Sequence, residues 1–397
     1  MKYFLAIVIV AGQTVFCGCS GDSTIVKPEI SASSLRVAEG NSTEIIAEVK
    51  LSINEPARED IVISFSTEDR TAKSGKDYTG TDAGSVTLSA GSSSVNLAIP
   101  ILPDDNLEFT EEFVVRLKEP ENASLSSEYI TIRIQDNDQF VPESDAEGTF
   151  SPASYPDLIL VWGEEFNGPG IDTEAWTFEL GDGCPDLCGW GNNELQDYTA
   201  EEENVRISNG KLVITALKED NSQNYTSARM ITRGNREFQY GRIDIRARLP
   251  YGQGIWPAIW MLGANIGQVG WPRCGEIDIM ELVGHLPGVS HGTAHFDVGG
   301  WQSKGSSYSL SAGQTFTDEF HVFSILWEKD NIKWYVDYQK FFELSGETVG
   351  GTYPFNNPFF FILNIAVGGN WPGNPDGTTV FPQVMEIDYI RVFQPQG

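Results

Sequence analysis

Three carboxylates stand close together in the stretch Gly275-Glu-Ile-Asp-Ile-Met-Glu-Leu-Val283. In an extended strand alternate side chains share a face, so Glu276 and Asp278 point one way and Glu281 falls out of phase. A β-bulge that extrudes one residue at Ile279-Met280 returns Glu281 to the face of the other two acids. Neighbouring carboxylates repel each other, and this repulsion raises the pKa of one of them into the working range of a general acid.

A pair of carboxylates, one protonated and one ionised, is what glycoside hydrolysis requires. Retaining enzymes hold the two groups about 5–5.5 Å apart, and inverting enzymes hold them about 6.5–9.5 Å apart. Four strand steps of about 3.3 Å put the Cα atoms of Glu276 and Glu281 about 13 Å apart, so backbone spacing alone does not choose between these geometries. An acidic, solvent-facing strand or a calcium-binding rim is the alternative interpretation of the same acids.

The elements that must position these acids belong to a strand-rich region, residues 155–397. The segment Gly241–Leu249 alternates perfectly and directs its apolar residues to one side. The other candidate strands are Leu158–Trp162, Lys211–Ala216, Ile332–Val336, Phe359–Asn364 and Ile387–Phe393. About 240 residues of this pattern favour an all-β fold, a large two-sheet jelly roll whose open concave face can hold a long polymer.

A second strand-rich region precedes it, at residues 28–138. Short β-branched runs such as Ile61–Phe65 and Tyr129–Ile134 alternate with clusters of Gly, Ser and Asp, a pattern typical of a β-sandwich. Residues 139–154 combine Pro, Gly, Ser and acids without periodicity, which predicts a linker between the two regions.

The composition excludes some functions. A formal net charge of −30, from 26 Lys and Arg against 56 Asp and Glu, repels polyphosphates and argues against nucleic-acid binding. Aromatic residues make up 11% of the chain and include 10 Trp, and flat aromatic faces suit sugar-binding clefts. Cys184 and Cys188 are close enough to close a small loop in an oxidising compartment. We expect a monomer.

The first 19 residues have the features of an export signal. An apolar run from Tyr3 to Ala11 is shorter than the ~20 residues of a membrane span. Cys19, preceded by Gly18, resembles the lipobox of bacterial lipoproteins. This implies a lipidated Cys19, a tether at residues 20–27 and an anchor in the bacterial outer membrane or at the cell surface. An ordinary secretion signal is the alternative.

The acids and their surroundings resemble glycoside hydrolase family 16, close to its laminarinase branch. The motifs that carry the resemblance are Tyr251-Gly-Gln-Gly-Ile-Trp-Pro-Ala-Ile-Trp-Met-Leu-Gly263, Gly189-Trp-Gly-Asn-Asn-Glu-Leu-Gln196, Trp162-Gly-Glu-Glu-Phe166 and Met385-Glu-Ile-Asp-Tyr-Ile-Arg-Val392. The resemblance implies a concanavalin-like β-jelly roll that hydrolyses internal β-1,3 bonds of glucans with retention and without a catalytic cofactor. It makes Glu276 the nucleophile, Glu281 the acid/base, and Asp278 the residue that tunes both.

The same resemblance implies further contacts. Tryptophans of this family line the cleft, where an indole can stack on the apolar face of a sugar. The substrate-binding candidates are Trp256, Trp260, Trp190, Asn193, Arg229 and His295, and their alternative roles are core packing or surface pairing. A structural calcium site on the convex side is implied for Glu165, the main-chain carbonyl of Gly210, and Asp388.

Residues 28–138 resemble a Calx-beta domain. The resemblance rests on Val37-Ala-Glu-Gly40, Gly75-Lys-Asp-Tyr78 and Ile134-Gln-Asp-Asn-Asp138. It implies calcium binding at one end of the sandwich, where carboxylates supply the oxygen ligands. The candidate ligands are Glu39, Asp77, Asp104, Glu108, Glu111, Asp136 and Asp138. A solvated acidic rim on a spacer domain is the alternative.

Three rival functions are compatible with the sequence. The bulged spacing of the acids also resembles that of agarases and carrageenases, so a galactan-active enzyme of the same family is one. A glucan-binding module without activity is the second, and a calcium-dependent adhesion protein is the third. The Asn-Asn-Glu-Leu-Gln and Gly-Ile-Trp-Pro-Ala-Ile-Trp runs favour an enzyme acting on β-1,3-glucan.

Overall fold

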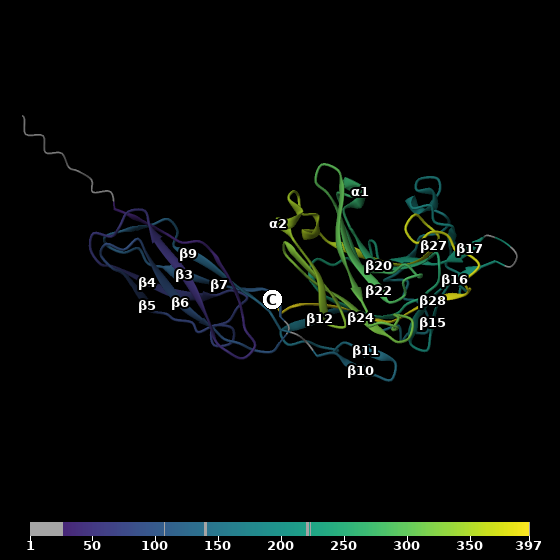
Figure 1. Ribbon diagram of the computed structural model, residues 1–397, viewed down its shortest axis with the longest axis horizontal. Coiled ribbons are helices and arrows are strands. Elements are labelled where there is room, and N and C mark those ends of the chain that lie inside the picture. The colour runs from purple at the N-terminus through teal and green to yellow at the C-terminus, as the bar shows by residue number, and fades with distance from the viewer. Residues whose placement is uncertain (1–26, 107, 139–140, 220–221, 223, 397) are drawn as a thin grey trace, which may run out of the picture. The chain divides into compact units, whose positions relative to one another are not determined.

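The computed structural model describes residues 27–106, 108–138, 141–219, 222 and 224–396 (Figure 1). The expected signal peptide and Cys19 lie outside the described residues. Among the residues described, one compact unit comprises residues 27–37, 45–102 and 112–133, and the other comprises the remainder. No helix in these ranges is both long enough and apolar enough to cross a bilayer.

The N-terminal region forms two antiparallel-rich sheets, as the alternating runs predict. One sheet has the strand order β6-β3-β1-β8 and the other β2-β9-β7-β4-β5. Their bounds are β1 Glu29–Ser31, β2 Leu35–Ala38, β3 Ile45–Ile53, β4 Ile61–Asp69, β5 Gly84–Leu88, β6 Ser94–Ile101, β7 Glu111–Leu117, β8 Ser124–Leu125 and β9 Tyr129–Gln135. Alternate residues of β3 are buried, among them Val49 and Leu51, which is the pattern of a strand with one face on a sandwich core.

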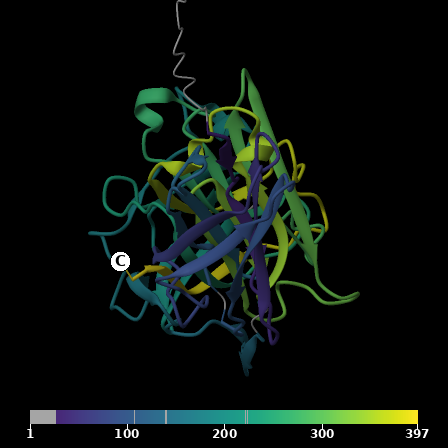
Figure 2. The same cartoon turned by 90° about the vertical axis from the view of Figure 1, so that its left-hand side faces the viewer.

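The C-terminal region contains a second, larger pair of sheets. A seven-stranded sheet has the order β13-β18-β27-β20-β21-β22-β23. Its strands are β13 Thr177–Phe178, β18 Arg229–Ile231, β20 Ile255–Gly263, β21 Glu276–Glu281, β22 Val289–Asp297, β23 Trp301–Ser309 and β27 Phe359–Val367. The hairpin of β22 and β23, in green, is visible in both views of the chain (Figures 1 and 2).

The other sheet has ten strands along the order β14-β17-β16-β28-β19-β24-β25-β26, with β12 beside β28 and β15 beside β16. Its bounds are β12 Leu158–Glu164, β14 Gln196–Tyr198, β15 Val205–Ser208, β16 Lys211–Lys218, β17 Tyr225–Ser227, β19 Gly241–Arg248, β24 His321–Glu328, β25 Asn331–Val336, β26 Gln339–Ser345 and β28 Gln383–Pro395. Short helical turns occur at α1 Ile266–Val269, α2 Gly346–Val349, Cys188–Gly191 and Pro354–Asn356. The predicted strands and the all-β class are therefore confirmed.

Strand β19 shows why perfect alternation does not mean one dry and one wet face. Its apolar side chains are buried, and so are Arg242, Asp244 and Arg246 on the opposite face. Arg242 Nη2 lies 3.0 Å from Asp244 Oδ1, and Tyr155 Oη donates to Asp244 Oδ2 at 2.5 Å. Buried charges need such partners, so the polar face of β19 is a paired layer rather than a solvated one.

Residues 139–154 differ from the expected linker. They contain the hairpin strands β10 Glu143–Asp145 and β11 Gly148–Phe150. The Thr149 amide donates to the Phe320 carbonyl at 2.9 Å, and Arg246 Nε donates to the Thr149 carbonyl at 2.8 Å. Gly148 has φ 131°, and a Cβ there would lie 2.2 Å from the Phe320 carbonyl oxygen, so only glycine allows this approach. Main-chain and arginine contacts hold this segment, which is why it lacks an apolar period.

Candidate active site

Strand β21 carries the three acids and is bulged. Against β20, Ile259 pairs with Met280 and Trp260 pairs with Asp278, which leaves Ile279 without a partner. Against β22, Asp278 and Glu281 pair with residues only two apart, so the same irregularity appears on both sides of the strand. One extruded residue brings the side chain of Glu281 back to the face of the earlier acids. The predicted bulge is confirmed.

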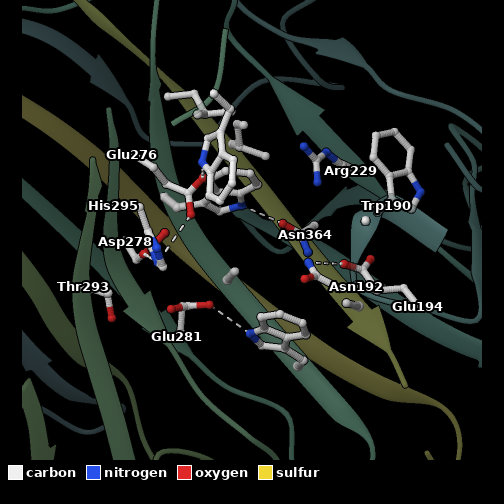
Figure 3. A pocket seen from close by; sticks show the side chains of 18 of the residues that line it. Trp190, Asn192, Glu194, Arg229, Glu276, Asp278, Glu281, Thr293, His295 and Asn364 are labelled. Carbon is white, nitrogen blue, oxygen red and sulfur yellow. Dashed lines mark hydrogen bonds and ion pairs between the residues drawn. The ribbon is translucent and has the colours of Figure 1, made fainter. Parts of the chain in front are cut away.

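The three acids lie in a cleft over the seven-stranded sheet. The cleft has a volume of about 890 Å³, and Glu276, Asp278 and Glu281 all line it. Figure 3 shows Glu276 and Asp278 beside His295, with Arg229 and Trp190 across the cleft. Tryptophans from five separate segments also line it, so flat apolar faces surround a charged floor.

Each acid has a ring nitrogen beside it. Trp271 Nε1 donates to Glu276 Oε2 at 2.9 Å, and Trp256 Nε1 donates to Glu281 Oε1 at 3.0 Å. His295 Nε2 lies 3.2 Å from Asp278 Oδ2 and 3.6 Å from Glu276 Oε1. The two indole donors help to orient the carboxyl groups of Glu276 and Glu281, a form of preorganisation.

Burial raises the pKa of all three carboxyl groups, and repulsion from neighbouring acids adds to the shift at Glu276 and Glu281. Burial raises the pKa of Glu276 to about 8, with the charge of Asp278 as the second cause. Burial raises the pKa of Glu281 well above its ordinary value, and Asp278 and Glu276 add to the shift. Burial likewise raises the pKa of Asp278. Three negative charges are therefore not held together at neutral pH, so the site contains a carboxylic acid that can donate a proton.

The raised pKa of Glu276 makes the free energy of unfolding depend on pH. A carboxyl whose pKa rises from 4.5 to about 8 on folding stabilises the fold below pH 4.5, and this stability is lost as pH rises toward 8. We expect Glu276→Gln to raise the free energy of unfolding by about 4 kcal/mol at pH 8 and to leave it unchanged at pH 4. Denaturant unfolding at both pH values measures this difference. The exposed Glu203→Gln is the control, and an equal gain for Glu276→Gln at both pH values would refute ionisation of the buried carboxyl as the cause.

Comparisons with known proteins identify the chain. Residues 192–391, half of the sequence, match glycosyl hydrolases family 16. The chain belongs to glycosyl hydrolase family 16. Residues 23–138 match the Calx-beta domain, so the resemblances of the two strand-rich regions to these two families are confirmed.

Individual relatives of this family 16 chain agree with that placement. The laminarinase catalytic domain from Thermotoga maritima, solved in complex with cetyltrimethylammonium bromide, is 50% identical, covers 61% of this chain and 100% of its own, and has a TM-score of 0.57. Glucan endo-1,3-beta-glucosidase A1 from Niallia circulans is 40% identical over 272 residues, which span 63% of this chain and 40% of the relative. The beta-glucanase from Rhodothermus marinus is 41% identical over 254 residues, which span 60% of this chain and 86% of the relative.

The cleft of this family 16 domain has an aromatic wall across from the acids. Arg229 lies over two of its rings, with its guanidinium carbon 4.4 Å from the ring centre of Trp190 and 4.9 Å from that of Trp260. Its Nε donates to Glu179 Oε2 at 2.6 Å. Trp260 Nε1 donates to Asn364 Oδ1 at 2.8 Å. The structure therefore brings four of the predicted substrate contacts, Trp256, Trp260, Trp190 and Arg229, into one cleft together with His295.

Asn193 does not line the cleft. It has φ 57°, in the left-handed region, and its Nδ2 donates to Asn370 Oδ1 at 2.8 Å. Its neighbours Asn192 and Glu194 line the cleft instead. A left-handed residue rotates the side-chain direction of the loop, which spacing along the chain does not reveal. A substrate contact at Asn193 itself stays a prediction.

Several cleft residues were not predicted from the sequence. Trp271, Trp301 and Trp371 stand on loops or at a strand start, 48%, 56% and 43% exposed. Asn364 is in the middle of β27, which reads as a continuous apolar strand. A signal for the tryptophans was available, because an exposed Trp between Gly, Pro or Asn residues is costly unless it has a ligand to cover it.

The residues expected to bind calcium on the convex side are otherwise engaged. Arg391 donates from Nε and Nη2 to the two oxygens of Glu165, at 2.7 and 2.9 Å. Asp388 accepts from Arg246 Nη1 at 2.7 Å. The acid clusters that the described residues form do not include Glu165 or Asp388. Arginines therefore pair with both acids in this structure, and calcium binding by Glu165, the Gly210 carbonyl and Asp388 stays a prediction.

The acids at one end of the sandwich do gather. Glu39, Asp136 and Asp138 can each place a ligand oxygen within 4.8 Å of the others, and Glu39, Asp104 and Glu108 do the same. Burial raises the pKa of Glu39 to about 8 and that of Asp138 to about 6, with neighbouring acids adding to both shifts. The candidate ligand Glu111 begins β7, and Asp77 is buried and accepts from the Lys73 amide at 2.6 Å.

Proposed function

We propose that the chain is a retaining endo-hydrolase of β-1,3-glucan. The observation that carries the proposal is the bulge in β21, which gathers Glu276, Asp278 and Glu281 on the floor of a cleft lined by tryptophans. Relatives named as laminarinase and as glucan endo-1,3-beta-glucosidase, at 50% and 40% identity, support this substrate class.

The surroundings of the acids support different roles for Glu276 and Glu281. The Trp271 N–H, His295 and Arg229 favour the ionised form of Glu276 and oppose the burial that raises its pKa to about 8, which supports this carboxyl as the one that ionises. Glu281, whose pKa burial and two acidic neighbours raise, holds the proton. We assign Glu276 as the nucleophile, Glu281 as the acid/base, and Asp278 as the group whose charge tunes both.

The reaction then proceeds in two balanced steps. The Glu276 carboxylate attacks the anomeric carbon while Glu281 gives its proton to the departing glycosidic oxygen, which breaks the bond between two sugars. The glycosyl ester on Glu276 is cleaved when Glu281, now ionised, takes a proton from water and the water oxygen bonds to the same carbon. Two inversions leave the product with the β configuration of the substrate.

Product profiling tests this proposal. The full chain is incubated with laminarin, mixed-linkage β-1,3-1,4-glucan, agarose and carrageenan, and the products are followed by size and by NMR of the new reducing end. We expect rapid release of mixed oligosaccharides from laminarin with the β anomer first. An initial α anomer would overturn retention, and cleavage of agarose or carrageenan alone would overturn the substrate.

We propose that the acids at the end of the sandwich bind calcium. The cluster of Glu39, Asp104, Glu108, Asp136 and Asp138 offers enough oxygens for a cation that takes 6–8 ligands. Asp138 Oδ2 is buried and has no hydrogen-bond partner among the described residues, as expected of an atom meant for a cation.

Calcium should therefore stabilise the protein. At a concentration 100-fold above its dissociation constant, a cation that binds only the folded state adds about 2.7 kcal/mol. We expect calorimetry of the full chain to show a transition that moves upward with Ca²⁺ and returns with chelator. Asp136→Asn should abolish the shift, whereas Asp82→Asn, an acid of the same sandwich outside the cluster, should keep it. A transition indifferent to calcium would leave only a solvated acidic rim.

We also propose that the protein is exported and anchored to the bacterial outer membrane or cell surface through lipid on Cys19. The support is the short apolar run and the cysteine that follows it. Cys19→Ser should release the protein from the membrane fraction of cells that process lipoproteins, and unchanged membrane association would contradict the anchor.

A further inference from the structure

Of the three acids, Asp278 depends on an imidazole. Its side chain is buried, and Oδ2 has no well-aligned hydrogen bond from the described residues. The nearest nitrogen is His295 Nε2, at 3.2 Å. A neutral imidazole carries its proton on only one of two nitrogens, so Asp278 faces either an N–H donor or a lone pair.

The hydrogen bond at Nδ1, the other ring nitrogen of His295, decides between these two states. Trp301 Nε1 donates to His295 Nδ1 at 3.0 Å, and the two rings are inclined by only 7°. An indole N–H is a donor and never an acceptor. His295 Nδ1 must therefore keep its lone pair, which puts the imidazole proton on Nε2, toward Asp278 and Glu276.

The β22–β23 hairpin aims Trp301 at this nitrogen. Asp297 Oδ1 accepts from the amides of Gly299 and Gly300, at 2.9 and 3.1 Å, and closes the turn. Asp297 then pairs with Trp301, and His295 pairs with Ser303. A shift of one residue in this register would carry Trp301 to the opposite face of the sheet.

We propose that Trp301 is a positioning residue that fixes His295 in the Nε2–H tautomer, so that a proton donor faces the acids of the site. The inference rests on the proposed function for its kinetic consequence only. The donor lies 3.2 Å from Asp278 and 3.6 Å from Glu276, where it stabilises negative charge on the pair.

The tautomer of His295 also decides whether the nitrogen that faces the acids can donate a proton or can bind a metal ion. Glu276, Asp278 and His295 can place one atom each within 4.8 Å of one another, a spacing that would suit Zn²⁺. A histidine binds zinc through a nitrogen lone pair. With the Trp301 N–H on Nδ1, the nitrogen that faces the acids has no lone pair to offer. Trp301 thereby favours a proton over a divalent cation at this point.

The tautomer is measured directly by ¹⁵N NMR of the histidine side chains. The full chain has only 4 His, and His295→Gln assigns the resonance. We expect wild-type His295 at pH 7.5 to be protonated on Nε2, with an Nδ1 resonance typical of a hydrogen-bond acceptor. In Trp301→Phe this resonance should move toward that of a free lone pair. A wild-type His295 protonated on Nδ1 would overturn the inference, whether or not the enzyme hydrolyses any glucan.

Kinetics supply the second test, with Trp371→Phe as the matched control. Trp371 is also an exposed tryptophan of the cleft, and it packs edge-to-face on a histidine, His291, with ring centres 5.0 Å apart. We expect Trp301→Phe to lower kcat on laminarin about fivefold with KM changed less than twofold, and to lower the inhibition constant of Zn²⁺ about fivefold. Trp371→Phe should change KM and leave zinc inhibition as in the wild type.

Equal kcat and zinc sensitivity in Trp301→Phe and wild type would overturn the proposed role. A wild-type enzyme that cleaves no β-glucan would instead refute the proposed function.

Discussion

Replacement of Glu276 by serine is expected to lower kcat on laminarin by at least about 10⁴-fold and to leave binding of the polymer within a few-fold of wild type. The serine hydroxyl is too short and too weakly nucleophilic to form the ester on which the first step depends. Trp190 and Arg229 lie across the cleft from Glu276 (Figure 3), and Arg229 also stacks on Trp260, so the proposed sugar-binding surface is kept. Affinity electrophoresis in laminarin and a reducing-sugar assay measure the two quantities.

The control for this variant is Glu203→Ser, an exposed glutamate of the same domain, which should retain full activity. Because removal of Glu276 also removes a buried charge, the variant should unfold at a temperature no lower than wild type at pH 8. Loss of activity accompanied by loss of laminarin binding would point to a damaged cleft and not to a missing nucleophile. Undiminished hydrolysis would end the assignment.

The bulge in strand β21 could be predicted because the places of its three acids conflict with the two-residue period of a strand. Glu276 and Asp278 obey the two-residue period, and Glu281 breaks it, so a strand with all three acids in one cleft needs a bulge. The buried neighbours Ile277 and Met280 reinforce this inference, because their side chains occupy the core face. The local sequence is therefore sufficient to predict the bulge.

The cleft walls could be predicted only in part. Trp256 and Trp260 stand in a strand whose period shows which face they occupy. Trp271, Trp301 and Trp371 come from a loop, a strand start and a second loop, and no period relates these segments to the acids. Their convergence depends on which strands are neighbours in the sheet, a property of the whole topology.

Some contacts could not be predicted from the sequence, and they share a cause. Asn193 has a left-handed backbone angle and binds Asn370, and Glu165 pairs with Arg391, which is 226 residues away in the sequence. The hairpin at Gly148 is held by the main chain of Phe320. In each case a partner distant along the chain, or one backbone angle, decides the outcome, and neither leaves a pattern in the local sequence.

Glu281→Gln should separate the two steps of the reaction. The amide oxygen can still accept the Trp256 N–H, so the variant keeps the local geometry but has no proton to donate. General acid–base catalysis contributes about 10²–10⁴-fold, and we expect kcat on laminarin to fall toward the upper end of this range because a sugar alkoxide is a poor leaving group.

A substrate whose leaving group needs no proton should escape this loss in the first step. With 2,4-dinitrophenyl β-laminaribioside, we expect Glu281→Gln to release a burst of dinitrophenolate equal to the enzyme and then to stall, because no base activates water. Azide, which needs no base, should restore turnover and yield the β-glycosyl azide by a second inversion at the anomeric carbon. Formation of the α-azide, or a burst that is absent in Glu281→Gln but present in Glu276→Ser, would reverse the roles of the two glutamates on the bulged strand.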